Sequence, residues 1–430
     1  MRKLSIISIG VGLSLITQIG FAQPAGQSGG DAAEPVKKKP WRSELSGEIE
    51  AAYKYFPDEA LYASQKEAYF ATTFRPKYYL ESDKGKHAFI FEGFATLDQY
   101  DNKRSHVDVR ELYYRYVFKS FEVSLGAKKI YWGVIESNHL VDVINQADVL
   151  EGFDPENKLG QPMLHLSVAP KWGTLDLMIM PYFRELKFPG LPSRGRPDFL
   201  GLSLGDARYE AEAEEYNPDI ALRWSHSFGV FDIGVSNFYG TSRLPQLKFD
   251  PLTWELYPYY ETINQSGLDL QASTGPMLWK TEMMYRIPKD TARDPITAFV
   301  LGGEYTFGNL FRSGVDLGLL VEYSYDDRPL IESFNGLTND MFFAARLALN
   351  DVQSTEFLGG VMIGMLNQAD KTSGVFSGSK IFNVAASRRL GASWKLTVDL
   401  LAYNCIDEGE IFLNFLRNDS NVKIGLAKFF

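Results

Sequence analysis

The densest set of polar side chains that could act on a solute lies in residues 128–162, KKIYWGVIESNHLVDVINQADVLEGFDPENKLGQP, here called loop 3. The candidates within it are Glu136, His139, Asp142, Asp148, Glu151 and Asp154. Opposing bases could come from strand-like segments elsewhere, at Arg75, Lys77, Arg110, Lys128, Arg223 and Arg346. Opposed acids and bases create a transverse electric field that orients polar solutes. If the fold places them face to face across a lumen, these residues are candidates for a channel constriction. The alternative is that loop 3 only covers the mouth of the molecule.

Catalytic and metal-binding patterns are weak in this sequence. His139 and Asp142 have helical i, i+3 spacing, but no second His or Cys is near, and the chain has only five His. A serine hydrolase would need converging Ser, His and Asp, and no G-x-S-x-G is present. The acidic run YEAEAEEY at 209–216 could bind divalent cations, although such runs are more often solvated loops. Cys405 has no partner for a disulfide. We expect no catalytic residues, no metal and no cofactor.

The elements that must position these side chains alternate in polarity with the period of a β-strand. Phe121, Val123, Leu125 and Ala127 alternate with Glu122, Ser124, Gly126 and Lys128, and several other segments follow the same pattern. These segments are about 10 to 13 residues long, closer to the 9 to 11 of a tilted membrane strand than to the 5 or 6 of a soluble one. Aromatic residues near their ends, including Trp132 and Phe183, are typical of the aromatic girdles of outer-membrane barrels.

We predict an all-β fold: a transmembrane antiparallel β-barrel of about 18 strands, with about 16 as the alternative count. Short connections such as 82–86, 119–121, 227–229, 274–276 and 390–393 alternate with long polar ones such as 133–161, 186–215, 242–262, 326–338 and 405–419. Short periplasmic turns and long outer loops are the organisation of such barrels. Within loop 3, the pattern favours a short helix at 138–149 with Asn138 as its N-cap.

The N-terminus and the composition define the compartment. Arg2 and Lys3 precede an uncharged apolar run that ends at Ala22, which predicts a signal peptide at 1–22, then a flexible periplasmic segment at 23–43 and the barrel at 44–430. The net charge of −10 argues against a nucleic-acid partner. The mean hydropathy of −0.18 excludes a bundle of membrane helices. The predicted location is the cell outer membrane.

The C-terminal strand VKIGLAKFF carries a further signature. Together with the signal peptide and the strand pattern, it resembles the C-terminal signal of bacterial outer-membrane barrels, at Gly425, Leu426 and Phe430, although Lys428 stands where an aromatic residue is usual. The resemblance implies recognition by the barrel-assembly machinery. Other expected partners are outer-membrane lipid and lipopolysaccharide, and a homo-oligomer is an open alternative.

As a whole, the chain resembles porin-like outer-membrane barrels, in particular 18-stranded substrate-specific channels and alginate-export barrels. The W-G-x-x-E-S and VDVINQAD stretches of loop 3 also resemble uncharacterised barrel proteins of this type. In general porins the third outer loop folds into the barrel, and the resemblance implies the same here. We therefore expect a passive channel for small hydrophilic or amphiphilic solutes, narrowed by loop 3. The alternative is a non-conducting structural or secretion-accessory barrel whose outer loops bind a partner or a polysaccharide.

Overall fold

The computed structural model describes residues 41–152, 156–196, 204–328, 339–365, 378–406 and 411–430. The predicted signal peptide at 1–22, most of the segment at 23–43, and Asp154 lie outside the described residues.

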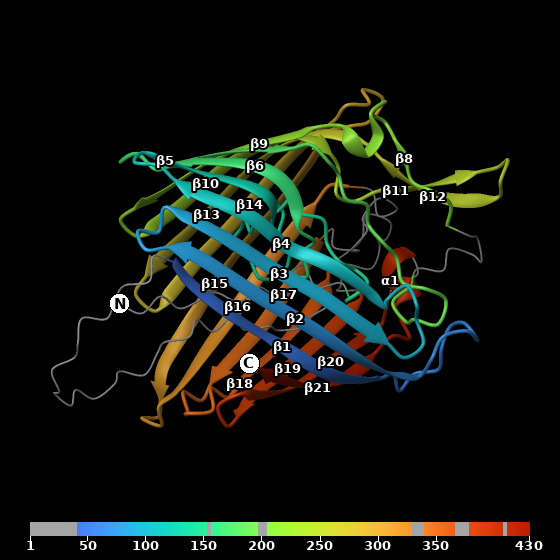
Figure 1. The fold of residues 1–430 in the computed structure, drawn as a ribbon. Helices are drawn as coiled ribbons and strands as arrows, with labels where there is room; N and C mark the ends of the chain where they lie inside the picture. Colours follow the sequence, from blue (N-terminus) through green and yellow to red (C-terminus); the bar gives the residue numbers. More distant parts are fainter. Residues whose placement is uncertain (1–40, 153–155, 197–203, 329–338, 366–377, 407–410) are drawn as a thin grey trace.

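Eighteen strands form one continuous sheet (Figure 1). They are β1 Trp41–Tyr55, β2 Ala68–Ser82, β3 His87–Asp98, β4 His106–Val117, β5 Phe121–Lys128, β6 Gln161–Val168, β7 Thr174–Met180, β9 Asp219–Phe228, β10 Phe231–Thr241, β13 Thr262–Thr274, β14 Met277–Pro288, β15 Ile296–Leu310, β16 Val315–Asp326, β17 Asn339–Ala348, β18 Glu356–Gly364, β19 Lys380–Leu390, β20 Trp394–Asn404 and β21 Asn421–Phe429.

The sheet closes on itself. Each of these strands pairs antiparallel with the next in the chain, and β21 pairs with β1 over Glu48–Tyr55. Closure satisfies the backbone groups of every strand without leaving an open sheet edge in the membrane. The predicted fold class and the count of 18 are therefore confirmed, and 16 strands is excluded. The barrel begins at Trp41, three residues before the predicted start at 44.

The two faces of the barrel differ as the alternation predicts. Large apolar side chains are exposed on the outer face all around the sheet, for example Leu125, Leu222, Trp279, Leu319 and Ile424. This belt is the surface that meets lipid. Two of the aromatic residues predicted for the girdle are instead buried inside the protein. The Arg223 guanidinium lies over the Trp132 ring, 5.3 Å from its centre, and the Phe183 ring packs against Tyr260. That prediction was wrong because β5 and β7 end at Lys128 and Met180, so the alternation stops before these residues.

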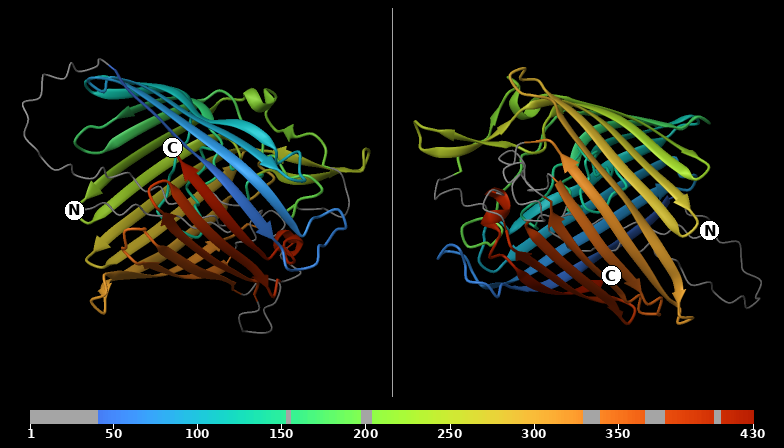
Figure 2. Two further views of the ribbon diagram at one scale, coloured as in Figure 1. Left: turned by 60° about the horizontal axis from the view of Figure 1, so that its bottom comes forward. Right: turned by 180° about the vertical axis from the view of Figure 1, so that it is seen from behind.

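The long connections gather at one end of the barrel, opposite the short turns (Figures 1 and 2). There, β8 Arg208–Tyr209, β11 Gln246–Asp250 and β12 Glu255–Tyr260 form a second, small sheet, which the sequence pattern did not predict. A 3-10 helix, Glu214–Tyr216, and a short helix, α1 Ile411–Phe415, lie at the same end. Among the described residues, no helix is long and apolar enough to span a membrane.

The helix predicted at 138–149 is absent, and that prediction was wrong. The described part of loop 3 consists of turns and irregular backbone, with one isolated bridge between Ala147 and Lys158. The apolar residues that suggested one helix face are divided between two places: Leu140 packs with Met284, whereas Val141 and Ile144 belong to a different cluster. Contacts with the barrel wall therefore override the local preference.

The C-terminal residues close the barrel. Phe430 exchanges two backbone hydrogen bonds with Gly47, of 3.1 and 3.2 Å, and its ring stacks on Phe74. Leu426 and Phe430 are exposed on the outer face, and Gly425 lies where a Cβ would be 2.8 Å from the Glu50 carboxylate. Recognition of this strand by the assembly machinery stays a prediction.

Candidate functional site: the lumen and loop 3

Loop 3 lies inside the barrel, held by two carboxylates of the inner wall. Glu282 of β14 accepts backbone N–H bonds from Val134, Ile135 and Val141, at 2.7, 3.0 and 3.2 Å. Glu322 of β16 accepts N–H bonds from Glu136 and Ser137, at 3.0 and 2.8 Å. Both carboxylates are almost completely buried. Irregular backbone removed from water needs such acceptors, because no strand partner provides them.

The W-G-x-x-E-S stretch supplies the loop side of this attachment. Gly133 has a φ of +106°, and a Cβ there would be 2.4 Å from the Glu282 carboxylate, so glycine is required on both counts. The Glu136 carboxylate is fully buried and pairs with Lys280 at 2.9 Å and with Arg346 at 3.6 Å. Glu136 therefore anchors the loop.

His139 lies beside the same wall carboxylate, 3.9 Å from Glu282. Burial alone would lower the pKa of His139, but the Glu282 carboxylate outweighs it and raises the pKa above its usual value.

The VDVINQAD stretch holds the second half of the loop through polar side chains. Asn145 accepts from the N–H of Ile130 at 2.8 Å and donates to the carbonyls of Lys128 and Leu159. Gln146 donates to the carbonyls of Arg184 and Arg243. These bonds tie both ends of the loop to one another and to the neighbouring outer loops.

Two acids in the same region pair with bases. Asp142 pairs with Lys158, and Asp148 pairs with Arg110 of β4. His106 lies 3.4 Å from Asp148. Burial alone would raise the pKa of Asp148, but His106 and the Arg110 guanidinium hold it below its usual range. His139, Asp142 and Asp148 are thus buried in contacts with the protein.

Apolar packing fills the lumen on this side. Val141 and Ile144 pack with inward side chains of β6, β7, β9 and β10, including Met163, Met178 and Phe238. Ile135 and Leu140 pack with Met284, Ala298 and Val300 of β14 and β15. Along these strands, loop 3 therefore packs directly against the inner wall of the barrel.

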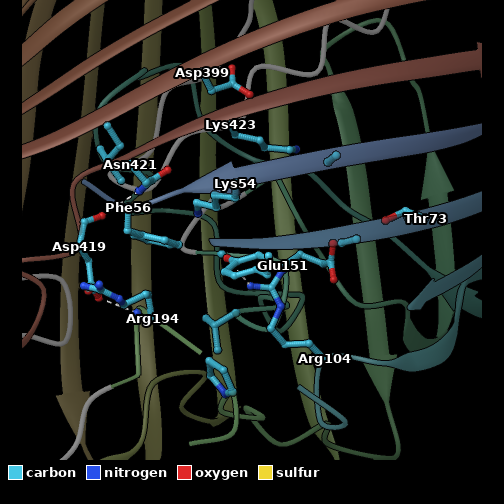
Figure 3. Close-up of a pocket in the computed structure, with 18 of the residues that line it drawn as sticks. Lys54, Phe56, Thr73, Arg104, Glu151, Arg194, Asp399, Asp419, Asn421 and Lys423 are labelled. Carbon is cyan, nitrogen blue, oxygen red and sulfur yellow. Dashed lines mark hydrogen bonds and ion pairs between the residues drawn. The ribbon is translucent and has the colours of Figure 1, made fainter. Parts of the chain in front are cut away.

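A cavity remains on the opposite side, between the tip of loop 3 and the wall formed by β1, β2, β20 and β21 (Figure 3). Its volume is ≈ 110 Å³. The loop contributes Val149, Glu151 and Gly152, and the wall contributes small residues such as Ala52 and Ala71 beside charged ones. The outer loops contribute Pro189, Arg194 and Leu416.

Of the constriction candidates, Glu151 and Arg75 line this cavity. Glu151 interacts electrostatically with Arg75 and with Arg104, and it has a buried carboxylate oxygen without a hydrogen-bond partner among the described residues. Arg75 pairs with Glu48 and Glu50, at 2.6 and 3.1 Å.

The other bases lie elsewhere on the inner wall. Lys77 pairs with Glu92 at 3.4 Å, and Arg223 pairs with Asp269 through both guanidinium nitrogens. Lys128 contacts His165 at 3.0 Å. Arg110 and Arg346 contact loop 3 as described above.

Arg194 fixes the outer side of the cavity. Its side chain is completely buried and donates to the carbonyls of Asp58, Lys66 and Asn418, at 2.8, 3.2 and 2.9 Å. It also pairs with Asp419 at 3.4 Å (Figure 3). One guanidinium thus links three outer loops above the cavity.

The nearest approach to a hydrolase triad consists of Ser124, His165 and Asp176 on β5, β6 and β7. His165 contacts Asp176 at 2.8 Å, but its other ring nitrogen contacts Lys128 at 3.0 Å. Ser124 is buried and has no hydrogen-bond partner in the described residues. A nucleophile activated by His165 would need a hydrogen bond between the two. Within the same residues, no group of three His, Cys, Asp or Glu side chains is placed to hold a metal ion.

Several residues that shape the site were not among the sequence candidates. Glu282 and Glu322 could be assigned only to the inner face, because the sequence does not show which backbone amides they meet. Lys54, Asp399 and Lys423 of the cavity wall lie on three strands that meet only when the barrel closes.

The closed 18-stranded antiparallel sheet, its exposed apolar belt and its polar interior define this chain as an outer-membrane β-barrel protein. No family model and no curated protein matches its sequence. Solved structures do match its fold.

Two channel-type barrels match at a TM-score of 0.51. One is OccK11 (OpdR) of Pseudomonas aeruginosa, 10% identical, with 90% of this chain and 95% of that chain covered. The other is a BenF-like porin of Pseudomonas fluorescens Pf-5, 10% identical, with coverages of 91% and 98%. The Escherichia coli barrel Wzi, described as carbohydrate-binding and involved in capsule assembly, matches at 0.49, with 10% identity and coverages of 88% and 83%. At these identities the likeness shows the fold alone.

Proposed function

We propose that this barrel is a passive outer-membrane channel for small hydrophilic or amphiphilic solutes, and that loop 3 narrows its lumen. The observation that carries the proposal is the cavity between the loop tip and the wall of β1, β2, β20 and β21. An 18-stranded barrel is wide enough for an aqueous lumen unless a loop fills it. Here the loop fills one side, so solutes pass along the other.

The charges around this passage predict weak ion selectivity. The cavity is lined by five bases, Lys54, Arg75, Arg104, Arg194 and Lys423, and by four acids, Glu50, Glu151, Asp399 and Asp419. Most of them form ion pairs with one another or with nearby residues. A nearly balanced wall favours neither anions nor cations strongly.

Thiol blocking of single channels tests the proposal. In a Cys405→Ser background, which removes the exposed native thiol, Ala52→Cys places a thiol in the cavity. A charged methanethiosulfonate reagent should then lower the conductance in planar bilayers. Ala51→Cys is the matched control, because Ala51 pairs with the outward Leu426 and faces lipid. Absence of any conductance, or an equal response of both variants, would contradict the proposed route.

Deleting residues 136–156 is a complementary test, because it removes most of the loop. The conductance should rise and discrimination between solutes should fall. Unchanged conductance would show that loop 3 does not narrow the path.

A second candidate function is a non-conducting barrel that binds a partner or polysaccharide through its outer loops. It is favoured by the exposed aromatic tip of the β11–β12 hairpin, where Phe249 and Trp254 are in edge contact and Trp254 is 69% exposed. Exposed aromatic rings can stack on sugars. This candidate predicts a barrel without conductance whose polysaccharide binding is lost in Trp254→Ala.

A further inference from the structure

A row of charged side chains crosses the wall of the cavity. Asp399 of β20 is paired in register with Lys423 of β21, Lys423 with Lys54 of β1, and Lys54 with Tyr69 of β2. All four line the cavity, and Figure 3 shows Asp399, Lys423 and Lys54 following one another on neighbouring strands. We call Asp399, Lys423 and Lys54 the charged row.

The two ends of the charged row have no ion pair or hydrogen bond within the described part of the chain. Lys423 reaches Glu50 at 3.2 Å, and other cavity charges, such as Arg75 and Arg194, are also paired. Lys54 has only a ring contact, 5.4 Å from the centre of Phe56. Asp399 is 7% exposed and lies on the cavity wall. Asp399 interacts with Lys423 and with Lys54 only beyond ion-pair distance. A charge partly removed from water without a direct hydrogen-bonded partner is costly, so these two groups are suited to a ligand that supplies such a partner to each.

On the outer side of the charged row, the cavity presents apolar and aromatic side chains beside Asn421 and the paired Arg194 and Asp419. Leu401 and Tyr403 follow Asp399 on β20 at alternate positions, and Phe56 follows Lys54 at the end of β1. Leu401 and Tyr403 also pack against the buried cluster that contains Leu416. A solute in this cavity would therefore meet apolar and aromatic surface at one end and two opposite charges at the other.

We propose that the cavity binds a zwitterionic organic solute with an apolar or aromatic body. Its anionic group pairs with the Lys54 ammonium, its cationic group pairs with the Asp399 carboxylate, and its apolar part packs against Phe56 and Leu401. A simple anion would leave Asp399 without a partner, and a simple cation would leave Lys54 without one. This inference rests on the proposed function and names the class of solute that the channel takes.

Equilibrium binding to the full-length protein in detergent micelles tests the inference, using saturation-transfer NMR. The probes are L-phenylalanine as the zwitterion, N-acetyl-L-phenylalanine as the anion and L-phenylalaninamide as the cation. One charge-assisted hydrogen bond is worth roughly a factor of ten or more in affinity, so L-phenylalanine should bind about tenfold tighter than either analogue.

The variants assign each charge. Asp399→Asn should abolish the preference for L-phenylalanine over the anion, and Lys54→Gln should abolish the preference over the cation. Lys84→Gln, in the short β2–β3 turn, is the control and should keep both preferences. Retained β-sheet circular dichroism shows that each variant is folded. Equal binding of the three probes to the native protein, undetectable binding of L-phenylalanine, or preferences that survive in both variants, would overturn the inference.

This measurement needs no conduction, so the two proposals can fail separately. Selective binding by a barrel that does not conduct would overturn the channel and leave the zwitterion site. Conduction without selective binding would overturn the zwitterion site and leave the channel.

Discussion

Replacing Glu282 by Gln should release loop 3 from the barrel wall. The Glu282 carboxylate accepts backbone bonds from Val134 and Ile135 on one oxygen and from Val141 on the other. Glutamine keeps one oxygen acceptor and places an NH2 group against the remaining N–H. The barrel itself should be unaffected, because β14 keeps its ladder to β13 and β15.

The expected cost follows from these three bonds. A buried N–H left without an acceptor costs about 1 to 3 kcal/mol. The two remaining hydrogen bonds no longer have a charged acceptor. Each contributes about 1.5 to 3 kcal/mol in the native protein, and this contribution is roughly halved. Docking of the loop should therefore weaken by roughly 2.5 to 6 kcal/mol, and the undocked population should rise at least ~60-fold, since each 1.4 kcal/mol is a factor of ten.

Hydrogen exchange of the loop amides measures this directly, whether or not the barrel conducts. The peptide covering 133–141 should exchange at least ~60-fold faster in Glu282→Gln than in the native protein. The control is Glu304→Gln. Glu304 is also inside the barrel, 3.8 Å from Lys280 and from Arg346, but it accepts no bond from the loop backbone among the described residues. Equal exchange in the two variants would refute the assigned role of Glu282.

Three further predictions concern the same loop and the outer mouth. Gly133→Ala should raise the hydrogen-exchange rate of the loop as much as Glu282→Gln does, because the added methyl group would clash with the Glu282 carboxylate and the backbone would be strained. A loop that exchanges at the native rate would contradict this prediction. Arg194→Met should lower the melting temperature and expose the outer loops to protease, because the carbonyls of Asp58, Lys66 and Asn418 would lose their donor. Unchanged cleavage by protease would contradict this prediction. The pKa of His139 is raised in the docked loop, so protonated His139 stabilises docking. This stabilisation is fully present below about pH 6.5 and is lost as pH rises through the raised pKa. Loop exchange should accordingly accelerate beyond the intrinsic rate as pH rises above about 6.5, and His139→Asn should remove this excess.

Strand number, strand order and the two faces were predictable from the sequence because each depends on a local pattern. Alternation over 121–127, for instance, sets both the strand and its orientation, whatever the rest of the chain does. The girdle assignments of Trp132 and Phe183 failed where that local pattern ended. The helix at 138–149 failed for a related reason: the amides of Val141, and of Ser137 just before the predicted start, are bonded by carboxylates more than 100 residues away in the sequence.

The contacts that each candidate residue makes were predictable only in part, and their role in a constriction stays a prediction. The segment that enters the barrel was identified, but most of its acids proved to be anchors, because a loop inside a barrel must first satisfy its own buried groups. Glu151 differs since it lies at the tip, beyond the last wall contact of Asp148. The charged row could not be found from the sequence. Asp399 and Lys54 are more than 340 residues apart, and they become neighbours only through the closure of β1 on β21.

The buried backbone also accounts for part of the acidic excess of this chain, which has 54 acidic and 44 basic residues. A strand satisfies its amides through its neighbours, whereas an irregular loop inside a barrel has N–H donors and few acceptors. A carboxylate can accept several such bonds at once and needs no base beside it. Acids that accept backbone N–H bonds from loops recur through the structure, at Asp101, Glu282, Glu322 and Asp419, and Asp219 and Glu210 accept them from strand ends. Amide dipoles offset their negative charge, with Arg243 and Arg194 adding to this at Asp219 and Asp419, so the acids of this chain can outnumber its bases.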